Sequence, residues 1–414
     1  MKKTTFFLVL AIILTGFFQV KGENKPRGNN TIDLRKNVSS INQSGVRKVK
    51  DLIIYRDTMF YSAFPSVIKR PDGEILLAFR RAPERRLFGQ EGVSHTDPNS
   101  YLVMVRSRDG ENWTSDPELI YAHPFGGSQD PCLLQLTDGT LLCTGYTWGL
   151  IRPDADQVLN RPITLVKSKS EQLPAFTFLG GYLVRSTDGG DTWTGPVYPP
   201  NVPAETQADV WGKPLPAYNR GALCEGKDSK IYWAVAARDV VSPAKTSVYL
   251  LISEDKGLSW SYSCPVAVDN EISFNETSLY ETPNGDLVAF LRTADMPDHH
   301  SCIARSSDGG KSFRWQSMNF YGYPLHALKL PDNRVLLTYG YRNKPYGIRG
   351  RILNPECSDF ETAAEFVIRD DGGTSDLGYS WAVQLDKKRV LVVYYFNTNN
   401  GNRYIAGTIL EIQS

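Results

Sequence analysis

Polar side chains stand at the start of apolar hairpins that recur six times along the chain. In five of the six copies the first strand opens with a polar or ionisable group, whereas the rest of the strand is mostly apolar. Such groups are costly to bury without partners, so their repetition indicates a ligand site where the strand starts converge. The alternative is a hydrated channel with self-paired side chains. The six openings are Ala63-Phe64, Gln129-Asp130, Asn219-Arg220, Asn275-Glu276, Leu325-His326 and Gly378-Tyr379.

The hairpins themselves supply the elements that would position these groups. Each has an apolar strand, a polar turn that usually carries Asp or Asn with Gly, and a second apolar strand. Asp-Gly and Asn-Gly are strong hairpin signals because such turns need positive φ angles. Near-continuous runs of Leu, Val, Ile and Ala indicate burial on both faces. The six copies are Phe64–Arg80, Asp130–Tyr146, Arg220–Ala237, Glu276–Arg292, His326–Arg342 and Tyr379–Phe396.

A second repeat, S-x-D-x-G-x-x-W, is interleaved with the hairpins. It is complete at 186–193 and 253–260, carries Phe in place of Trp at 306–313, and is one residue shorter at 107–113. In such a turn the Asp and Ser side chains satisfy backbone N–H groups, Gly takes a left-handed conformation, and the aromatic ring packs back on the sheet. We interpret these motifs as structural.

These motifs resemble the Asp-boxes of the sialidase superfamily. The resemblance implies an all-β fold, a six-bladed β-propeller of four-stranded antiparallel blades, which radial closure leaves with only short edges. We expect one propeller domain at 51–414, closed where a strand near Tyr404–Ile412 pairs with one in Leu52–Tyr55. The stretches 82–99 and 147–177 are expected to be loops over the ligand face.

Composition narrows the classes of function. A net charge of +1 gives no indication of nucleic acid or an acidic membrane surface. A basic start at Lys2 and Lys3, with an apolar run at 6–18, predicts a signal peptide at 1–22, followed by a flexible leader at 23–50. The run is too short for a membrane span, so we expect a periplasmic or extracellular protein. Five His and six scattered Cys show no metal-ligand spacing, so no cofactor is expected.

Three short segments resemble the catalytic segments of sialidases. Phe274 to Ser278 is similar to the segment that carries a catalytic Glu, which would be Glu276. Gly378 to Ser380 is similar to the segment that carries the nucleophilic Tyr, which would be Tyr379. Asp97 stands on a loop before a third strand, where sialidases carry their acid/base Asp, and Asp130-Pro131 resembles the opening of their second blade.

The resemblance implies retaining hydrolysis of a terminal acidic sugar such as sialic acid. Tyr379 would attack the anomeric carbon, Glu276 would take the phenolic proton, and Asp97 would protonate the leaving oxygen and later activate water. A Tyr nucleophile is a recognised exception to the two-carboxylate scheme. The residues expected to bind substrate are Arg292, Arg349, Arg342, Asp130, Arg220, His326 and Arg80.

One departure from the family pattern affects the substrate. Sialidases open their first inner strand with Arg-Ile-Pro, whereas this chain has Ala63-Phe64-Pro65, so the first carboxylate-binding Arg is missing. Another Arg, among 80, 81, 85, 86 and 220, could replace it. Two alternatives stay open: a hydrolase or polysaccharide lyase acting on a different sugar or uronate, and a glycan-binding propeller without catalysis. His95 could line the site or be structural.

Overall fold

The computed structural model describes residues 45–90, 95–160, 163–166, 175–241, 244–294, 299–399 and 401–413. The expected signal peptide and most of the expected leader lie outside these residues. All the described strands belong to one compact unit. Within the described ranges, no helix is long and apolar enough to cross a membrane.

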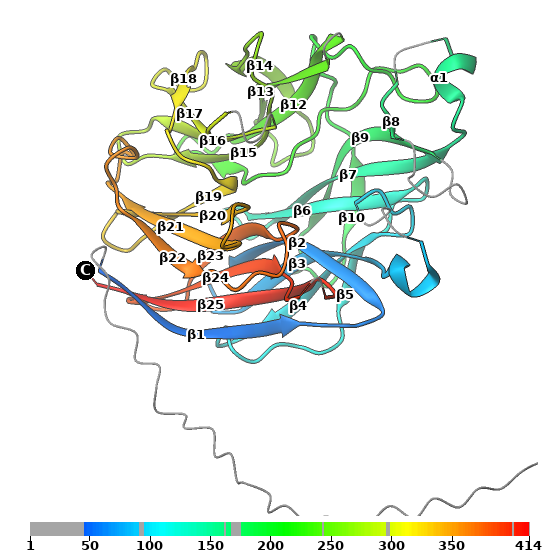
Figure 1. Cartoon of the computed structure of the whole chain (residues 1–414). Coiled ribbons are helices and arrows are strands. Elements are labelled where there is room, and N and C mark those ends of the chain that lie inside the picture. Colours follow the sequence, from blue (N-terminus) through cyan, green and yellow to red (C-terminus); the bar gives the residue numbers. More distant parts are fainter. Residues whose placement is uncertain are drawn as a thin grey trace, which may run out of the picture. The chain divides into compact units, whose positions relative to one another are not determined.

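Six antiparallel sheets are arranged around a common centre, which confirms the six-bladed propeller (Figure 1). Blade I contains β2 (Phe60–Lys69), β3 (Ile75–Pro83), β4 (Tyr101–Ser107) and β5 (Glu118–Tyr121). Blade II contains β6 (Gly127–Gln135), β7 (Leu141–Ile151), β9 (Ala175–Ser186) and β10 (Thr194–Val197), with β8 (Leu165–Val166) paired to β9. Blade III contains β11 (Cys224–Glu225), β12 (Ile231–Val241), β13 (Ala244–Ser253) and β14 (Ser261–Ala267).

The remaining three blades follow the same order. Blade IV contains β15 (Phe274–Glu281), β16 (Leu287–Thr293), β17 (Cys302–Ser306) and β18 (Arg314–Ser317). Blade V contains β19 (Tyr323–Lys329), β20 (Val335–Tyr341), β21 (Gly347–Leu353) and β22 (Glu365–Arg369). Blade VI contains β23 (Gly378–Gln384), β24 (Arg389–Phe396), β25 (Tyr404–Ile412) and β1 (Val46–Tyr55).

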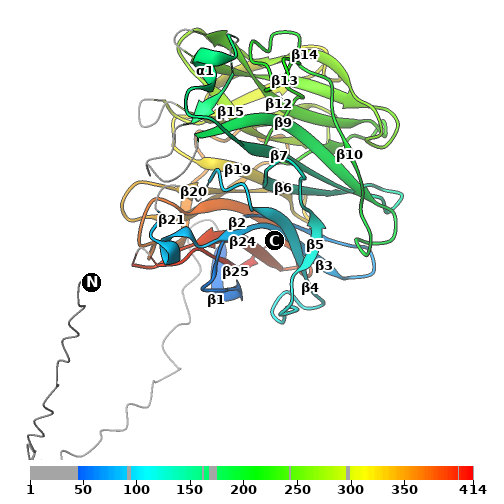
Figure 2. The ribbon, with the colours of Figure 1, turned by 90° about the vertical axis from the view of Figure 1, so that its right-hand side faces the viewer.

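Blade VI joins the two ends of the described chain. β1 pairs antiparallel with β25 from Val46↔Ile412 to Tyr55↔Ile405, so the outermost strand of this blade comes from the N-terminal end (Figures 1 and 2). The expected closure is therefore confirmed. The expected boundary at 51 is too late, because residues 46–50 pair with β25 and belong to the propeller rather than to a leader.

Apolar side chains fill the spaces between blades. Leu76 and Ala78 of β3 pack with Leu133 of β6 and Leu141 of β7, so one face of β3 is buried against blade II. The other face of β3, including Phe79, belongs to a larger cluster that reaches blade VI. This alternation follows from the two-residue period of a strand.

The four Asp-box turns have the hydrogen bonds expected of them. In the second box the Ser186 hydroxyl donates to Asp188 at 2.7 Å, while Gly190 N donates to the Ser186 oxygen at 2.8 Å. Asp188 also accepts from Thr192 N at 3.0 Å. Because the strands of a meander alternate in direction, these turns lie on the face opposite to the starts of the inner strands. The boxes are structural, and the other face is left for a ligand.

Two segments differ from expectation. β7 runs to Ile151, and it pairs with β9 from Trp148↔Phe178 to Ile151↔Ala175, so 147–151 is strand rather than loop. In the other segment, β3 extends to Pro83 and a 3-10 helix covers Arg85–Phe88. Besides that turn, the described residues contain one short helix, α1 (Ala155–Val158).

Candidate active site

The inner strands of three blades share a local distortion at the predicted site. Phe64, Asp130 and Tyr379 occupy equivalent positions and have φ angles of 59°, 48° and 55°. Each lies within a register irregularity of its hairpin, where two residues of the inner strand face fewer on its partner. Bulges of this kind redirect a side chain. A left-handed conformation is unfavourable for bulky residues, and such strain is concentrated at functional sites.

The phenol of Tyr379 meets the carboxylate of Glu276. The Tyr379 hydroxyl donates a short hydrogen bond to Glu276 Oε1, and Arg292 Nη1 forms an ion pair with Glu276 Oε2. Arg292 Nη1 also donates to the Tyr379 hydroxyl oxygen at 3.2 Å. Tyr379 is only 6% exposed and Glu276 9%. The three side chains therefore form one buried, hydrogen-bonded unit drawn from blades IV and VI.

The charge states of this unit follow from its surroundings. Burial raises the pKa of the Tyr379 phenol above its usual value, and Glu276 raises it further against the effect of Arg292. Burial alone would raise the pKa of Glu276, but Arg292 and the Tyr379 hydrogen bond hold it below its usual value. A neutral phenol thus donates to an ionised carboxylate, which is the arrangement of a nucleophile beside its base.

Asp130 is the second carboxyl of the site. Its Oδ2 accepts a hydrogen bond from the Tyr146 hydroxyl at 2.7 Å, while its buried Oδ1 has no hydrogen-bond partner among the described residues. Burial, and then the charge of Glu276, raise the pKa of Asp130 to about 6, although Arg220 lowers it. Neighbouring carboxyls with divergent pKa values are typical of acid–base sites.

The Arg220 guanidinium lies under the Tyr379 ring. Its central carbon is 4.7 Å from the Tyr379 ring centroid and 5.3 Å from that of Trp381. Nη2 donates to the carbonyl oxygens of Pro65 at 3.0 Å and Tyr379 at 3.3 Å. Arg220 precedes β11 rather than opening it, so the strand start predicted here is wrong, because the chain passes through Gly221 with a φ angle of 153°.

Two other predicted binding residues, Arg342 and Arg349, differ in their surroundings. Arg342 belongs to the site, since its guanidinium carbon lies 5.5 Å from the Tyr379 ring centroid and Nη2 donates to the Tyr395 hydroxyl at 3.4 Å. Arg349 is held within blade V, where Nη1 donates to Arg369 O at 2.9 Å and Nη2 to Pro345 O at 3.2 Å. The geometry therefore favours Arg342 over Arg349 as a ligand-binding residue.

Both predicted histidines have structural contacts. His326 Nδ1 accepts from Ala382 N at 3.3 Å and its ring stacks on Trp381 with centroids 4.4 Å apart. Burial, and then Arg220, lower the pKa of His326 to about 3, so the ring is neutral. His95 lies with its ring 5.4 Å from that of Phe64, and its Nε2 is 3.6 Å from Asp376.

Asp97 is buried and already paired. Arg85 binds it with two nitrogens, Nε to Oδ2 at 2.6 Å and Nη2 to Oδ1 at 3.0 Å, and Asn99 N donates to Oδ1 at 2.9 Å. Arg85 and the Asn99 N–H thus supply donors to both oxygens of Asp97. The predicted acid/base residue is therefore already bound by protein groups within its own loop.

Sequence reasoning missed Asp376, which links β2 of blade I to β24 and to the residue just before β25 in blade VI. It accepts hydrogen bonds from Tyr395 at 2.8 Å, from Tyr61 at 3.0 Å and from Arg403 Nε at 2.8 Å. Burial opposes its ionisation, yet His95 and Arg403 hold its pKa below the usual value. The residue stands in a loop outside any repeat, so no sequence pattern marked it.

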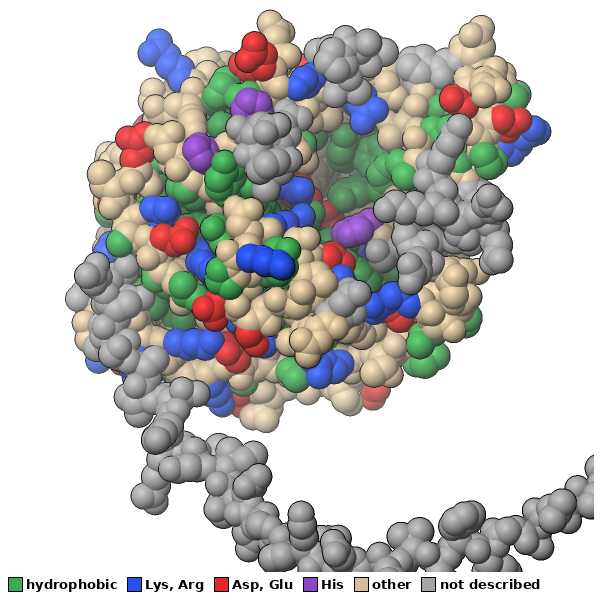
Figure 3. Space-filling view, in the orientation of Figure 1, with side chains coloured by type: hydrophobic (Ala, Val, Ile, Leu, Met, Phe, Trp, Pro, Cys, Tyr) green, Lys and Arg blue, Asp and Glu red, His purple; other side chains and the backbone are tan. Residues whose placement is uncertain are grey.

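A cavity of about 370 Å³ opens beside Glu276. That volume is within the range of small-molecule sites. Figure 3 shows this view of the molecule hollowed near its middle, with basic, acidic and His side chains around the hollow. The residues that line the cavity are Tyr146, Tyr218, Asn219, Arg220, Arg238, Thr246, Ser273, Asn275, Glu276 and Ala294.

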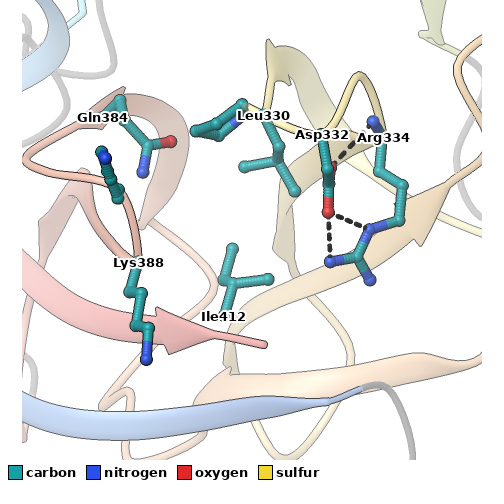
Figure 4. A pocket seen from close by; sticks show the side chains of 8 residues that line it. Leu330, Asp332, Arg334, Gln384, Lys388 and Ile412 are labelled. Carbon is teal, nitrogen blue, oxygen red and sulfur yellow. Dashed lines mark hydrogen bonds and ion pairs between the residues drawn. The ribbon is translucent and has the colours of Figure 1, made fainter. Parts of the chain in front are cut away.

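A second cavity, of about 40 Å³, lies between the turns of the β19–β20 and β23–β24 hairpins (Figure 4). Asp332 accepts from Arg334 Nε at 2.7 Å on one side, while Gln384, Lys388 and Ile412 stand on the other. A space of this size admits a water molecule but no sugar ring. The cavity beside Glu276 is therefore the better candidate for a glycan.

Comparison with known proteins places the chain in a family. Residues 163–394, more than half of the chain, match the family described as the BNR repeat-like domain. The chain belongs to this family. Its resemblance to the sialidase-like BNR propellers is therefore confirmed. No curated protein matches the sequence.

Solved structures share the BNR repeat-like fold. A protein of unknown function from Dyadobacter fermentans is 63% identical, with a TM-score of 0.85, and the match covers 89% of this chain and 100% of that chain. A NanB sialidase from Streptococcus pneumoniae is 13% identical over 92% of this chain and 71% of that chain, with a TM-score of 0.58. An α-L-arabinanase from Penicillium chrysogenum is 13% identical over 88% and 98%, with a TM-score of 0.59. The two enzymes establish a likeness of fold alone.

Proposed function

We propose that this protein is an exo-acting retaining glycoside hydrolase that releases a terminal acidic sugar from a glycan. The observation that carries the proposal is the contact between the Tyr379 phenol and the Glu276 carboxylate in a buried site beside a sugar-sized cavity. The sialidase and the arabinanase of similar fold support hydrolysis of a glycosidic bond. They do not indicate which sugar this protein releases.

The proposed first step forms a bond between Tyr379 and the sugar. Glu276 accepts the phenolic proton as the Tyr379 oxygen attacks the anomeric carbon, and the bond from that carbon to the leaving oxygen breaks. Arg292 touches both the phenol and Glu276, so it stabilises the negative charge that moves between them. A phenol is neutral before attack, which avoids repulsion of an anionic substrate.

The leaving oxygen needs a proton from a second group. Asp97 is the residue that the sequence predicts, but Arg85 already binds both of its oxygens. Asp130 has a raised pKa and an oxygen without a protein partner among the residues described. We therefore assign the proton to Asp130, which protonates the leaving oxygen so that it departs as an alcohol, and later takes a proton from the water that releases the sugar from Tyr379.

A substrate screen tests the proposal. The purified protein is incubated with α-linked aryl sialosides, aryl uronides and neutral aryl glycosides, beside Tyr379→Phe. We expect release of an acidic sugar by the wild type and loss of turnover by at least about 1,000-fold in the variant. Tyr394→Phe is the matched control, because this buried Tyr of the same blade has its hydroxyl 2.6 Å from that of Thr408 rather than against Glu276. Turnover of only neutral glycosides, or wild-type rates in Tyr379→Phe, would contradict the proposal.

The proposal includes export of the enzyme to the periplasm or the medium. The basic start at Lys2 and Lys3 and the apolar run at 6–18 support it. N-terminal sequencing of the protein from a fractionated native host tests it, and we expect a mature chain that starts near residue 23. An intact Met1 on the functional protein would contradict export by cleavage.

A further inference from the structure

Arg80 is a buried cation with unmet hydrogen-bonding capacity. It lies in β3 and is 0% exposed, yet Nε, Nη1 and Nη2 have no hydrogen-bond partner in the described part of the chain. Its neighbour Arg81 is different: it binds Asp57 at 2.6 Å and Tyr101 at 3.0 Å. Burying a guanidinium without hydrogen bonds costs free energy, so its presence here indicates a functional role.

Arg80 lies opposite Ala63, the position at which sialidases carry an Arg. Arg80 is the cross-strand partner of Ala63 in the β2–β3 ladder. It shares a face of β3 with Leu76 and Ala78, which pack against blade II. Arg80 therefore stands on the face of β3 that is turned to blade II, and its guanidinium carbon lies 5.7 Å from the Tyr61 ring centroid and 5.9 Å from that of Phe64.

Arg220 reaches the same strand from across the ring. Its Nη2 binds the carbonyl oxygen of Pro65, two positions after Ala63, while Nε and Nη1 are buried and lack partners among the described residues. Two guanidiniums with five unused nitrogens thus approach the bulge at Ala63, Phe64 and Pro65. A guanidinium presents paired donors that match a carboxylate in two-point contact.

We propose that Arg80 and Arg220 together bind the carboxylate of the terminal sugar, and so replace the Arg that is absent at Ala63. This inference rests on the proposed function, because it names the groups that recognise the acidic sugar at the same site. In this arrangement the anion lies against the unpaired nitrogens of both side chains, next to the cavity that Arg220 lines. A sulfate ester has similar chemistry, so the test must distinguish the two anions.

The first experiment measures affinity by isothermal titration calorimetry. The ligands are N-acetylneuraminic acid, its methyl ester and the pair N-acetylglucosamine 6-sulfate and N-acetylglucosamine. We expect the wild type to bind the acid at least about 10-fold more tightly than its neutral ester. In Arg80→Gln this preference falls by about 10-fold or more, while the affinity for the ester changes less than about twofold.

Arg81→Gln is the matched control. It removes an adjacent guanidinium that is already paired, so it lowers the unfolding temperature but keeps the preference for the acid. Arg80→Gln, in contrast, removes a charge without hydrogen bonds, and we expect its ligand-free unfolding temperature to equal or exceed that of the wild type. Arg80→Lys keeps the charge without the two-point contact, and it supplies the affinity measurement if the Gln variant does not fold.

The outcomes separate this inference from the proposed function. A wild-type preference for the acid that survives in Arg80→Gln, and in Arg80→Lys, overturns the role of Arg80 and leaves the acidic substrate standing. A wild type without preference for the acid overturns both. A preference for the sulfated sugar alone, lost in Arg80→Gln, supports an anion site here and overturns the carboxylate as its ligand.

Discussion

Glu276 accepts the hydroxyl hydrogen of Tyr379, a residue 103 positions further along the chain. The two residues begin inner strands of blades IV and VI, which share no hydrogen-bonded ladder. Their contact exists because every inner strand starts at the same end of the ring. Asp130 of β6 reaches the site in the same way, whereas Arg292 comes from the end of β16 and Arg220 from the segment before β11.

Glu276→Gln should abolish turnover while leaving the fold intact. The amide keeps the size of the side chain but cannot take the phenolic proton, so we expect kcat to fall by about 100- to 10,000-fold. KM should change little, since the ligand contacts are not removed. Steady-state kinetics and circular dichroism check this prediction. A kcat within tenfold of wild type would rule out Glu276 as the base.

Asp130→Asn and Asp97→Asn should differ in their effects. If Asp130 supplies the proton, Asp130→Asn slows hydrolysis of natural glycans far more than that of nitrophenyl glycosides, whose leaving groups need no acid. Asp97→Asn loses the pair with Arg85, so it should mainly lower the unfolding temperature. The ratio of rates on the two substrates is the measurement. A selective loss on natural glycans in Asp97→Asn, and not in Asp130→Asn, would identify Asp97 as the proton donor.

Stability should depend on pH through Asp130. Its pKa of about 6 exceeds the value in an unfolded chain, so the folded protein binds a proton that the unfolded chain has released. Stability from this group is therefore present below about pH 4 and is lost as the pH rises through 6. We expect Asp130→Asn to gain on the order of 2 kcal/mol relative to wild type between pH 4 and pH 7. Urea unfolding across this range gives the difference, and a constant difference would contradict it.

Gly221→Ala should strongly destabilise the propeller. A Cβ at this position would lie 1.8 Å from the Thr277 carbonyl oxygen, where the backbones of blades III and IV meet. We expect a loss of about 3 kcal/mol or more. Gly285→Ala is the control: no atom lies within 4 Å of its Cβ, and only its φ angle of 91° costs about 1 kcal/mol. Equal losses in urea unfolding would show that contact between the blades is not the cause.

All six cysteines should be thiols in the purified protein. The structure describes every one of them as free, and burial raises the pKa of Cys132 to about 11 and of Cys224 to about 12. We expect six thiols to react with Ellman's reagent in denaturant without prior reduction, and only slow reaction in the folded protein. Fewer than six would indicate a disulfide.

Much of the architecture could be read from local chemistry. Asp-Gly turns and Asp-boxes can be recognised from a few neighbouring residues without an alignment. Their repetition predicts the six blades. The sialidase resemblance implies the partnership of Tyr379 and Glu276, and their side chains meet in the structure.

Other features depend on neighbours that the sequence does not identify. The sequence shows no partner for Asp97, whereas in the folded chain Arg85 forms an ion pair with it. The sequence likewise shows no partner for Arg349, which donates to a backbone carbonyl of blade V in the structure. Asp376 gains its partners only when β2, β24 and the residue before β25 come together. Arg80 was one of several candidates to replace the missing Arg, and the ladder between β2 and β3 distinguishes it from Arg81.

The ladder between β1 and β25 has a consequence for how the protein reaches its native state. Its two strands lie at opposite ends of the described sequence, so closing it brings together the most distant parts of the chain. During synthesis β1 is made long before β25, so it has no partner until the last of the described strands has been made. Blade VI, which carries Tyr379, is therefore the last of the six blades to be completed, and a molecule truncated shortly before β25 would lack the strand that joins β1 to β24.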